Sequence, residues 1–327
     1  MKIIFYNAKP YDKKWFMPLA EQMGYIVKFR SVRLDEDSAG LAKGYDAVCA
    51  FVNDDVGSAT IDELAAAGVK GVLLRCAGFN NVDLAAAKGK IRILRVPSYS
   101  PEAVAEFAMA QLLTINRRTH RAYIRTKDFN MNINGLMGTN LYQKTIGIIG
   151  TGKIGQAMIR ICKGFGMKIL AYDLYPNPNL EVEYVELKRL FQESDMISLH
   201  CPLTKESRYM INKEALDLMK PGVYIINTSR GELICTEDLL EALVIPGKIG
   251  GVGLDVYEEE EELFYEDRSN EIMTDENMAR LVTLPNVLIT SHQAYFTNEA
   301  VETIAKVTME NARCLEEGLT TENEVMA

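Results

Sequence analysis

The chain has 327 residues, of which 48% are hydrophobic and 25% charged, the balance of a soluble globular protein long enough for two domains. Its formal net charge of -9 argues against nucleic acid or an anionic membrane surface as a partner. No apolar run reaches the roughly 20 residues that span a bilayer, and the N-terminus becomes polar too soon for a signal peptide. The six scattered cysteines lack metal-ligand spacing and predict neither a disulfide framework nor a metal site. We therefore expect a cytoplasmic protein.

The first 98 residues alternate short apolar segments with helical ones. The apolar segments are rich in β-branched residues and read as strands at 2–6, 25–29, 47–51, 71–75 and 91–96. Strands that alternate with helices favour a parallel sheet. The sequence therefore predicts an α/β domain in this part of the chain.

A helix start follows at Ser100-Pro101-Glu102, where Ser is a good N-cap, Pro fits the first helical position and Glu lies in the first turn. The helical pattern continues through small and apolar residues, and we expect one helix from 101 to 127. Such a helix is typical of a buried connector between two domains, and its basic end is a candidate two-fold interface. Residues 128–143 are predicted to be a loop.

From residue 145 the strand–helix alternation resumes. Six strands are predicted, at 145–149, 167–172, 196–200, 223–227, 249–254 and 287–290, the number expected for a full dinucleotide-binding sheet. The apolar helix 299–315 comes after that sheet is complete, so we expect it to return to the first domain. The predicted organisation is a discontinuous substrate domain at 1–99 and 295–327, and a nucleotide-binding domain at 100–294.

The most informative motif is Gly150-x-Gly152-x-x-Gly155, placed between the strand 145–149 and a helical pattern. Gly150 permits a tight turn, Gly152 lets the backbone approach a pyrophosphate, and Gly155 lets the helix pack closely on the strand. The next strand ends at Asp173, about 20 residues further on, where a carboxylate accepts hydrogen bonds from a ribose. Its charge would repel a 2′-phosphate, so the motif predicts NAD rather than NADP.

Candidates for proton transfer are few, because the chain has only three histidines. His120 lies in a basic helical segment and His200 precedes a proline loop, which favours structural roles for both. His292 follows the strand 287–290, and ligands of open α/β sheets bind beyond the carboxyl ends of strands. Arg230 ends another strand and offers a planar fork to a carboxylate. An acid of the run 258–262 would orient His292 and favour its charged form, although spacing alone does not select which one.

These strand ends resemble the D-2-hydroxyacid dehydrogenase family. The matching phrases are Asn-Thr-Ser-Arg-Gly around Arg230, Leu-Asp-Val-Tyr before the acidic run, and His-Gln-Ala at His292. Longer phrases, such as Leu-Arg-Cys-Ala-Gly-Phe-Asn-Asn-Val-Asp at 74–83, resemble the D-lactate dehydrogenases of fermentative bacteria within that family. The resemblance covers essentially the whole chain. It implies two doubly wound parallel-sheet domains, flavodoxin-like and Rossmann, with an active-site cleft between them.

Carried over residue by residue, the resemblance implies a catalytic set of Arg230, Glu260 and His292. The segment 239–248 is one residue longer than is usual in the family, but counting back from His292 still selects Glu260. The substrate set that the resemblance implies is Phe51, Ala77, Gly78, Tyr99, Arg230, His292 and Tyr295. The family usually has Phe where this chain has Tyr295, a difference that affects the polarity and size of the pocket.

For the cofactor, the resemblance implies NAD and no metal. The implied binding set is Gly150, Gly152, Lys153, Ile154, Gly155, Asp173, Cys201, Pro202, Thr228, Ser229 and Asp255. The implied reaction is reduction of pyruvate to D-lactate by NADH with a histidine acid, in a homo-oligomer (dimer or tetramer). Two alternatives remain: the same chemistry on 2-oxoisocaproate or phenylpyruvate, and an NAD-binding regulatory protein without turnover.

Overall fold

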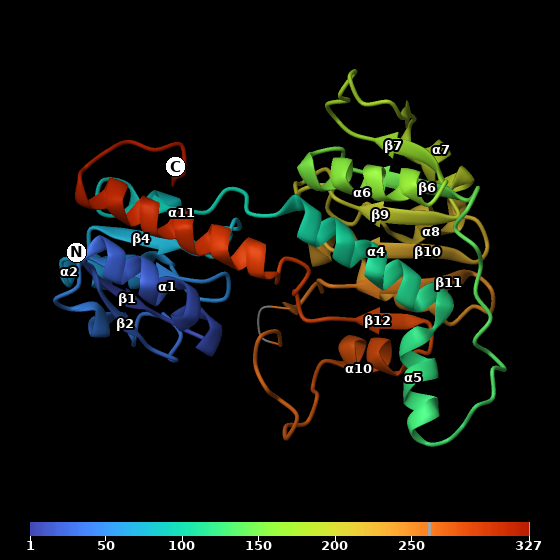
Figure 1. Cartoon of the computed structure of the whole chain (residues 1–327), viewed down its shortest axis with the longest axis horizontal. Helices are drawn as coiled ribbons and strands as arrows, with labels where there is room; N and C mark the ends of the chain where they lie inside the picture. The colour runs from blue at the N-terminus through green and yellow to red at the C-terminus, as the bar shows by residue number, and fades with distance from the viewer. Residues whose placement is uncertain (261–262, 327) are drawn as a thin grey trace. The chain divides into compact units, whose positions relative to one another are not determined.

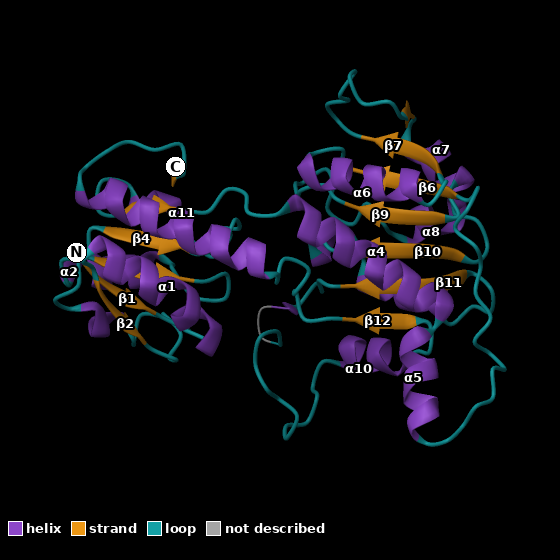
Figure 2. Ribbon diagram, in the orientation of Figure 1, coloured by secondary structure: helices purple, strands orange, loops and turns teal. Residues whose placement is uncertain are grey.

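The computed structural model describes residues 1–260 and 263–326, which form two compact units (Figure 1). One unit comprises Met1–Ser100 and Phe296–Ala327, and the other comprises Pro101–Tyr295. Each unit is built around its own sheet, with helices on the faces of that sheet (Figure 2). None of the helices in the described residues is both long and apolar enough to cross a membrane.

The first unit contains a six-stranded sheet in the order β13-β5-β4-β3-β1-β2. All neighbours run parallel except β13, which pairs antiparallel with β5. The strands are β1 Lys2–Phe5, β2 Ile26–Phe29, β3 Ala47–Ala50, β4 Gly71–Leu74, β5 Arg92–Leu94 and β13 Glu324–Val325. Apart from β13, this is the flavodoxin-like order.

Five helical segments accompany that sheet: α1 Pro10–Met23, the 3-10 turn Ala39–Ala42, α2 Ser58–Ala66, α3 Leu84–Ala87 and α11 Asn298–Glu316. The predicted helix 299–315 is α11, which contacts α1 and β4 within this unit. Its Thr297 cap accepts a hydrogen bond from the Ala300 N–H at 3.2 Å, satisfying one of the free donors of the first turn.

The second unit holds a parallel sheet of seven described strands in the order β12-β11-β10-β9-β6-β7-β8. Its strands are β6 Thr145–Ile149, β7 Lys168–Tyr172, β8 Glu183–Tyr184, β9 Met196–Leu199, β10 Val223–Asn227, β11 Ile249–Leu254 and β12 Val287–Ile289. The expected count of six was one too low. β8 is only two residues long and carries a charged residue, so it shows no apolar run in the sequence.

Helices cover both faces of this second sheet. They are α4 Pro101–Arg117, α5 Thr119–Lys127, α6 Lys153–Gly164, α7 Leu187–Glu193, α8 Lys213–Leu218, α9 Thr236–Leu243 and α10 Glu276–Thr283, with a 3-10 turn at Gly231–Leu233. The helices α4 and α6 share one apolar cluster, whereas α7 to α10 contribute to the other (Figure 1). Because both faces are covered, the central strands β6, β9 and β10 are buried along almost their whole length rather than alternating.

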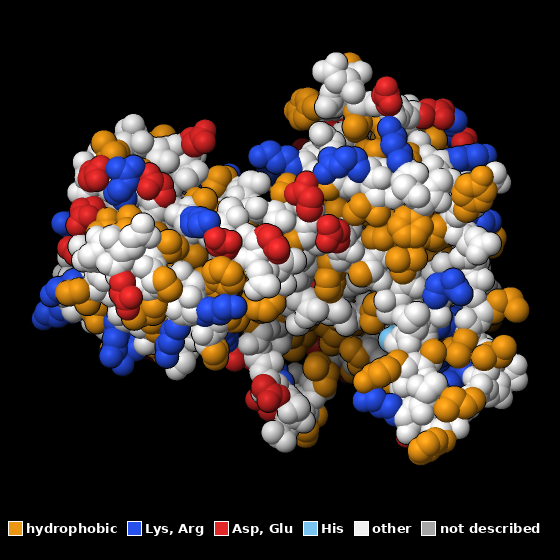
Figure 3. Space-filling view, viewed as in Figure 1, with side chains coloured by type: hydrophobic (Ala, Val, Ile, Leu, Met, Phe, Trp, Pro, Cys, Tyr) orange, Lys and Arg blue, Asp and Glu red, His pale blue; other side chains and the backbone are white. Residues whose placement is uncertain are grey.

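The helix predicted from 101 to 127 is instead two helices. Arg118 adopts a left-handed backbone with φ of 51°, which ends α4 and begins α5. The apolar face lies on α4, whereas α5 has no buried residue. Around α5 and the loop after it, exposed apolar side chains gather (Figure 3), including Phe129 at 88% exposure and Met137 at 89%. Exposed apolar clusters of this kind mark interaction surfaces.

Candidate active site

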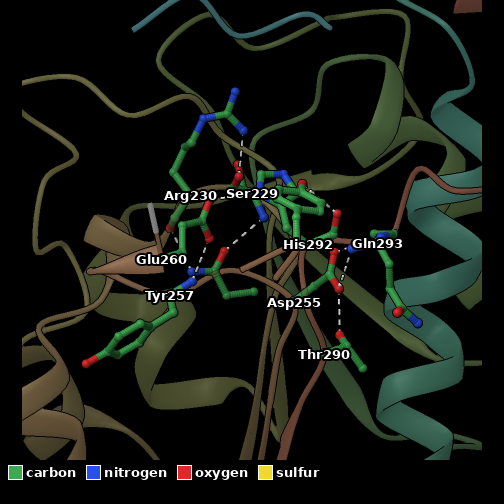
Figure 4. Close-up of polar contacts among 11 residues, drawn as sticks. Ser229, Arg230, Asp255, Tyr257, Glu260, Thr290, His292 and Gln293 are labelled. Carbon is green, nitrogen blue, oxygen red and sulfur yellow. Dashed lines mark hydrogen bonds and ion pairs between the residues drawn. The ribbon is translucent and has the colours of Figure 1, made fainter. Parts of the chain in front are cut away.

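Three neighbouring strands bring the predicted catalytic side chains to one edge of the second sheet. Because β10, β11 and β12 pair side by side in parallel, their carboxyl ends meet at that edge. Arg230 follows β10, Glu260 lies in the loop after β11, and His292 follows β12. Figure 4 shows these three residues from separate loops in one cluster.

His292 and Glu260 form a partly buried pair. The Nδ1 atom of His292 lies 2.7 Å from Oε1 of Glu260, and the two side chains are 21% and 22% exposed. The other carboxylate oxygen, Oε2, accepts a hydrogen bond from the backbone N–H of Tyr257 at 2.9 Å. The carboxylate is therefore held from both sides. Since Nδ1 is committed to Glu260, Nε2 is the ring nitrogen available for chemistry.

The backbone at His292 is unusual, because its φ of 50° lies in the left-handed region that non-glycine residues seldom adopt. Two hydrogen bonds hold it there. The His292 N–H donates to the backbone oxygen of Asp255 at 2.7 Å, and the Tyr265 hydroxyl donates to the His292 backbone oxygen at 3.0 Å. The strain is thus compensated by contacts from the loop after β11.

Asp255 anchors the turn that follows His292. Its side chain is fully buried and accepts a hydrogen bond from the Gln293 N–H at 3.0 Å (Figure 4). It also accepts one from the Ala294 N–H at 2.7 Å. Burial raises the pKa of Asp255, and hydrogen bonds from Thr290 and these two N–H groups oppose that rise. The carboxylate therefore acts as a structural hydrogen-bond acceptor for residues 292–294, which we call the histidine turn.

Arg230 has an extended backbone and one donor committed within its own turn. Its Nη1 donates to the backbone oxygen of Ser229 at 2.7 Å, while Asn227 braces the turn by donating to the Arg230 oxygen at 2.8 Å. A Cβ on the next residue, Gly231, would lie only 2.1 Å from the backbone of Tyr257. Glycine therefore lets the arginine turn approach the loop that carries Glu260. The remaining guanidinium donors can bind a carboxylate.

The three glycines at the β6–α6 junction have different surroundings. Gly150 has φ of 93°, and a Cβ there would lie 2.5 Å from the backbone oxygen of His200. A Cβ on Gly155 would lie 2.0 Å from the Gly150 oxygen, so helix and loop pack as closely as the motif predicts. Gly152, the N-cap of α6, faces open space within 4 Å, followed by Lys153 and Ile154 in the first helical turn. That space suits a phosphate group at a helix N-terminus.

Asp173 stands at the end of β7. Its Oδ2 accepts from the Thr151 N–H at 2.6 Å and the Thr151 hydroxyl at 2.8 Å, and Oδ1 accepts from the Tyr175 N–H at 2.9 Å. Burial raises its pKa, but these hydrogen bonds outweigh burial and hold the pKa below the ordinary value. The group is an ionised acceptor, and Oδ1 has a lone pair left for a ribose hydroxyl.

The remaining residues of the predicted cofactor set follow β9 and β10. Ser229 donates from Oγ to the Cys201 oxygen at 2.5 Å, which joins the two turns, and Pro202 accepts from Ser207 at 2.8 Å. Thr228 is 8% exposed, and its buried Oγ1 has no partner among the described residues. A buried hydroxyl of this kind at a strand end fits a polar ligand group.

The other two histidines are placed differently from His292. Burial lowers the pKa of His200 to about 4, and its Nε2 lies 2.9 Å from the Ser198 hydroxyl. His120 lies on α5, where burial also lowers its pKa. Both are therefore neutral near pH 7, and neither has a carboxylate partner among the described residues, unlike His292. In the described residues no three His, Cys, Asp or Glu side chains gather as a metal site.

The predicted substrate residues of the first unit follow its neighbouring strands β3, β4 and β5. Phe51 is 6% exposed, and the Arg75 guanidinium lies 5.0 Å from its ring centre. Ala77 and Gly78 are partly exposed in the turn after β4, where Arg95 donates to the Ala77 oxygen at 2.8 Å. Tyr99 is partly exposed after β5, and Tyr295 is the last residue of the second unit.

Residues 109–294 match the family described as "D-isomer specific 2-hydroxyacid dehydrogenase, NAD binding domain". The chain is 51% identical over 330 residues to a D-lactate dehydrogenase of Escherichia coli, with both chains fully covered. The apo-structure of D-lactate dehydrogenase from Escherichia coli superposes with a TM-score of 0.91 at 50% identity, covering 100% of both chains. The pyruvate reductase of Chlamydomonas reinhardtii superposes with a TM-score of 0.94 at 42% identity over 98% of each chain.

The chain therefore belongs to the D-2-hydroxyacid dehydrogenase family. It is an NAD-dependent enzyme with the family's two-sheet α/β fold. Three sites after the strands β6, β7 and β10 fit that cofactor: the open space at Gly152, the ionised Asp173, and the Thr228 hydroxyl, which has no partner among the described residues. The sequence motifs did not point to Tyr257, Tyr265 or Thr290, since such contacts depend on how the loops fold.

Proposed function

We propose that this enzyme reduces pyruvate to D-lactate with NADH. The observation that carries the proposal is the Glu260–His292 pair, 2.7 Å apart, beside Arg230 at the carboxyl edge of an NAD-binding sheet. Relatives that match at least 98% of the chain support the substrate, since they are described as a D-lactate dehydrogenase and a pyruvate reductase.

In the proposed mechanism Arg230 binds the pyruvate carboxylate and polarises the C2 carbonyl. The bound cofactor supplies the hydride to C2. His292 donates its proton from Nε2 to the carbonyl oxygen, which becomes the hydroxyl of lactate. Glu260 orients the ring through Nδ1 and stabilises the imidazolium before the transfer. In lactate oxidation, the same ring takes the proton back.

Residues of the first unit complete the proposal. The family resemblance also assigns the substrate carboxylate to the N–H groups of Ala77 and Gly78 and to Tyr99, and the wall of the pocket to Phe51 and Tyr295. The buried Arg75 supports the Phe51 ring from one face. A bulkier residue at position 51 should then raise the KM for pyruvate more than the KM for NADH.

The experiment is the loss of NADH absorbance with pyruvate, followed by enzymatic determination of the chirality of the product. Rapid oxidation with D-lactate as product supports the proposal. L-lactate as product would contradict it. NADH binding without turnover of any 2-oxo acid would point to a regulatory NAD-binding protein.

A second candidate is a larger 2-oxo acid. A structure described as D-2-hydroxyisocaproate dehydrogenase superposes with a TM-score of 0.88 at 34% identity over the full chain, which favours keeping this alternative. Comparing kcat/KM for pyruvate, 2-oxoisocaproate and phenylpyruvate separates the two. A higher value for either larger acid would keep the mechanism and change the substrate.

A homo-oligomer also belongs to the proposal. The exposed apolar side chains of α5 and the loop after it, such as Ile124 at 60% and Ile133 at 79% exposure, are the surface that we assign to a two-fold contact. Light scattering on the purified protein tests this. Ile133→Asp should dissociate the oligomer if this surface is the contact, and a monomeric wild type would end the proposal.

A further inference from the structure

We propose that Gln111 and Thr290 are positioning residues that act through Asp255 to hold His292 in its active conformation. This inference rests on the proposed function, because it extends the machinery around the acid. Neither residue reaches Nε2 of His292 through any hydrogen bond of the described structure.

A chain of hydrogen bonds leads from α4 to the histidine turn. Gln111 is 2% exposed, and its Nε2 donates to Oγ1 of Thr290 at 2.8 Å. Thr290 in turn donates to Oδ1 of Asp255 at 2.5 Å (Figure 4). The same Oδ1 accepts the Gln293 N–H at 3.0 Å, so the chain ends directly in the backbone that follows His292.

The direction of each hydrogen bond follows from the number of protons. Both oxygens of Asp255 accept backbone N–H groups, and the single hydroxyl proton of Thr290 goes to Oδ1. A lone pair of that hydroxyl then faces Gln111, which must present its NH2 group. The amide of Gln111 therefore prevents the Thr290 hydroxyl from rotating away from Asp255.

By holding the Thr290 hydroxyl in this orientation, Gln111 lowers the free energy of unfolding. Its Oε1 is buried without a partner among the described residues. The backbone of β11 comes so close that a Cβ on Gly253 would lie 3.0 Å from that oxygen. An unpaired buried acceptor is unfavourable, and an apolar side chain of similar length would avoid the penalty. A costly polar group at this position indicates a role other than stability.

The effect on His292 arises because its backbone is strained. Its left-handed φ of 50° is maintained by hydrogen bonds from the Asp255 segment, which contacts both His292 and the two residues after it. Without the Thr290 hydroxyl, the buried carboxylate of Asp255 loses one of the three hydrogen bonds that it accepts. The turn then loosens, and Nε2 spends less time in the position from which it donates.

The test compares Thr290→Val, Thr290→Ser and Gln111→Met with the wild-type enzyme. The control is Thr308→Val, because Thr308 is a fully buried threonine of the first unit whose hydroxyl has no partner among the described residues. We expect kcat for pyruvate to fall roughly tenfold or more in Thr290→Val and about threefold to tenfold in Gln111→Met. The Kd for NADH should stay within about twofold, and Thr290→Ser should restore most of kcat.

Two further results separate positioning from a structural role. Gln111→Met should have an unchanged or higher Tm although its kcat is lower. The double variant should be no slower than Thr290→Val alone, because Gln111 acts through Thr290. Full kcat in Gln111→Met, or additive losses in the double variant, would overturn the proposal.

The proposal can fail separately from the proposed function. If the wild-type enzyme turns over no 2-oxo acid, the ring signals of His292 in NMR spectra still report its position. His292→Asn assigns those signals among the three histidines. We expect the signals to shift in Thr290→Val and not in Thr308→Val. Identical spectra for Thr290→Val and the wild type would exclude a positioning role.

Discussion

Two regions along the carboxyl edge of the NAD-binding sheet are built in opposite ways. The glycine edge, residues 150–155 with Asp173, is one strand–turn–helix–strand segment whose geometry comes from missing side chains. The histidine edge, comprising Arg230, Glu260 and His292, takes its side chains from three loops. At the glycine edge a single added methyl group would overlap backbone 2.0 Å away. At the histidine edge the side chains are in contact through hydrogen bonds.

The two regions are sensitive to different kinds of substitution. Backbone that approaches backbone has no freedom to adjust, so substitutions at the glycine edge should reduce folding stability and cofactor binding together. Charged side chains on loops contribute little to folding in comparison. Substitutions at the histidine edge should therefore reduce turnover and leave the fold intact.

The largest expected effect is that of His292→Asn on turnover. We expect kcat to fall by roughly two to four powers of ten, the range that general acid catalysis supplies. NADH affinity and Tm should stay near wild-type values, because the fold does not depend on this ring. Steady-state kinetics and fluorescence titration with NADH measure both. His120→Gln, on α5, is the control and should keep full activity.

Arg230→Lys should come next. A lysine cannot form the two parallel hydrogen bonds of a guanidinium, so we expect kcat/KM for pyruvate to fall by about 10- to 100-fold. The control is Arg208→Lys, whose side chain is 52% exposed and paired with Glu232. Wild-type kcat/KM in Arg230→Lys would exclude a bidentate contact with the substrate.

Gly155→Ala tests the glycine edge. Its Cβ would lie 2.0 Å from the Gly150 oxygen, and we expect a loss of about 1–3 kcal/mol in the free energy of unfolding together with weaker NADH binding. Gly164→Ala, in the same helix, meets nothing within 4 Å and should be neutral or slightly stabilising. Denaturant unfolding compares them. Equal stability of the two variants would contradict the close packing seen here.

Asp173→Ser should change the cofactor preference. Removing the ionised acceptor should weaken NADH binding roughly tenfold, and the loss of its negative charge should improve the use of NADPH. The ratio of kcat/KM values for the two cofactors measures this effect. An unchanged ratio would show that Asp173 serves only to brace Thr151 and Tyr175.

The smallest change in the free energy of unfolding at neutral pH is expected for His200→Gln, next to the glycine edge. Burial lowers the pKa of His200 from 6.5 to about 4, so the unfolded chain takes up the proton more readily than the folded one. The resulting stability is fully present above pH 6.5 and is lost as pH falls from 6.5 towards 4. The free energy of unfolding measured in urea should differ less between pH 7.5 and pH 5 in the variant than in the wild type. An unchanged difference would mean that other groups cause the acid sensitivity.

The long strands and the glycine edge were predictable because their signals are contiguous in the sequence. The strand 145–149 and its turn, for example, are recognisable from apolar residues followed by three spaced glycines. The two short strands β8 and β13 were not predicted, since two-residue strands have no periodicity. The break at Arg118 was not predicted either, because arginine is a good helix former and only tertiary contacts favour its left-handed backbone.

At the histidine edge the sequence placed Arg230 and His292 at strand ends but did not select the carboxylate by spacing. The family resemblance selected Glu260, and the fold brings Glu260 within 2.7 Å of His292. The loop conformation after β11 decides which acid reaches the ring. Glu258, two residues away, instead accepts a hydrogen bond from the Thr236 N–H at 3.2 Å.

The two α/β patterns, the nucleotide loop and the cofactor class can be read from the sequence, because strand and helix periods, glycine positions and a terminal acid are local properties. The environment of His292 arises only in the folded protein. His292 has a left-handed backbone and pairs with Glu260. Hydrogen bonds run from Gln111 through Thr290 to Asp255 and connect residues that are far apart in sequence. Such contacts form only when β11, β12 and α4 pack together, since packing brings the hydrogen-bonding groups of distant segments within reach.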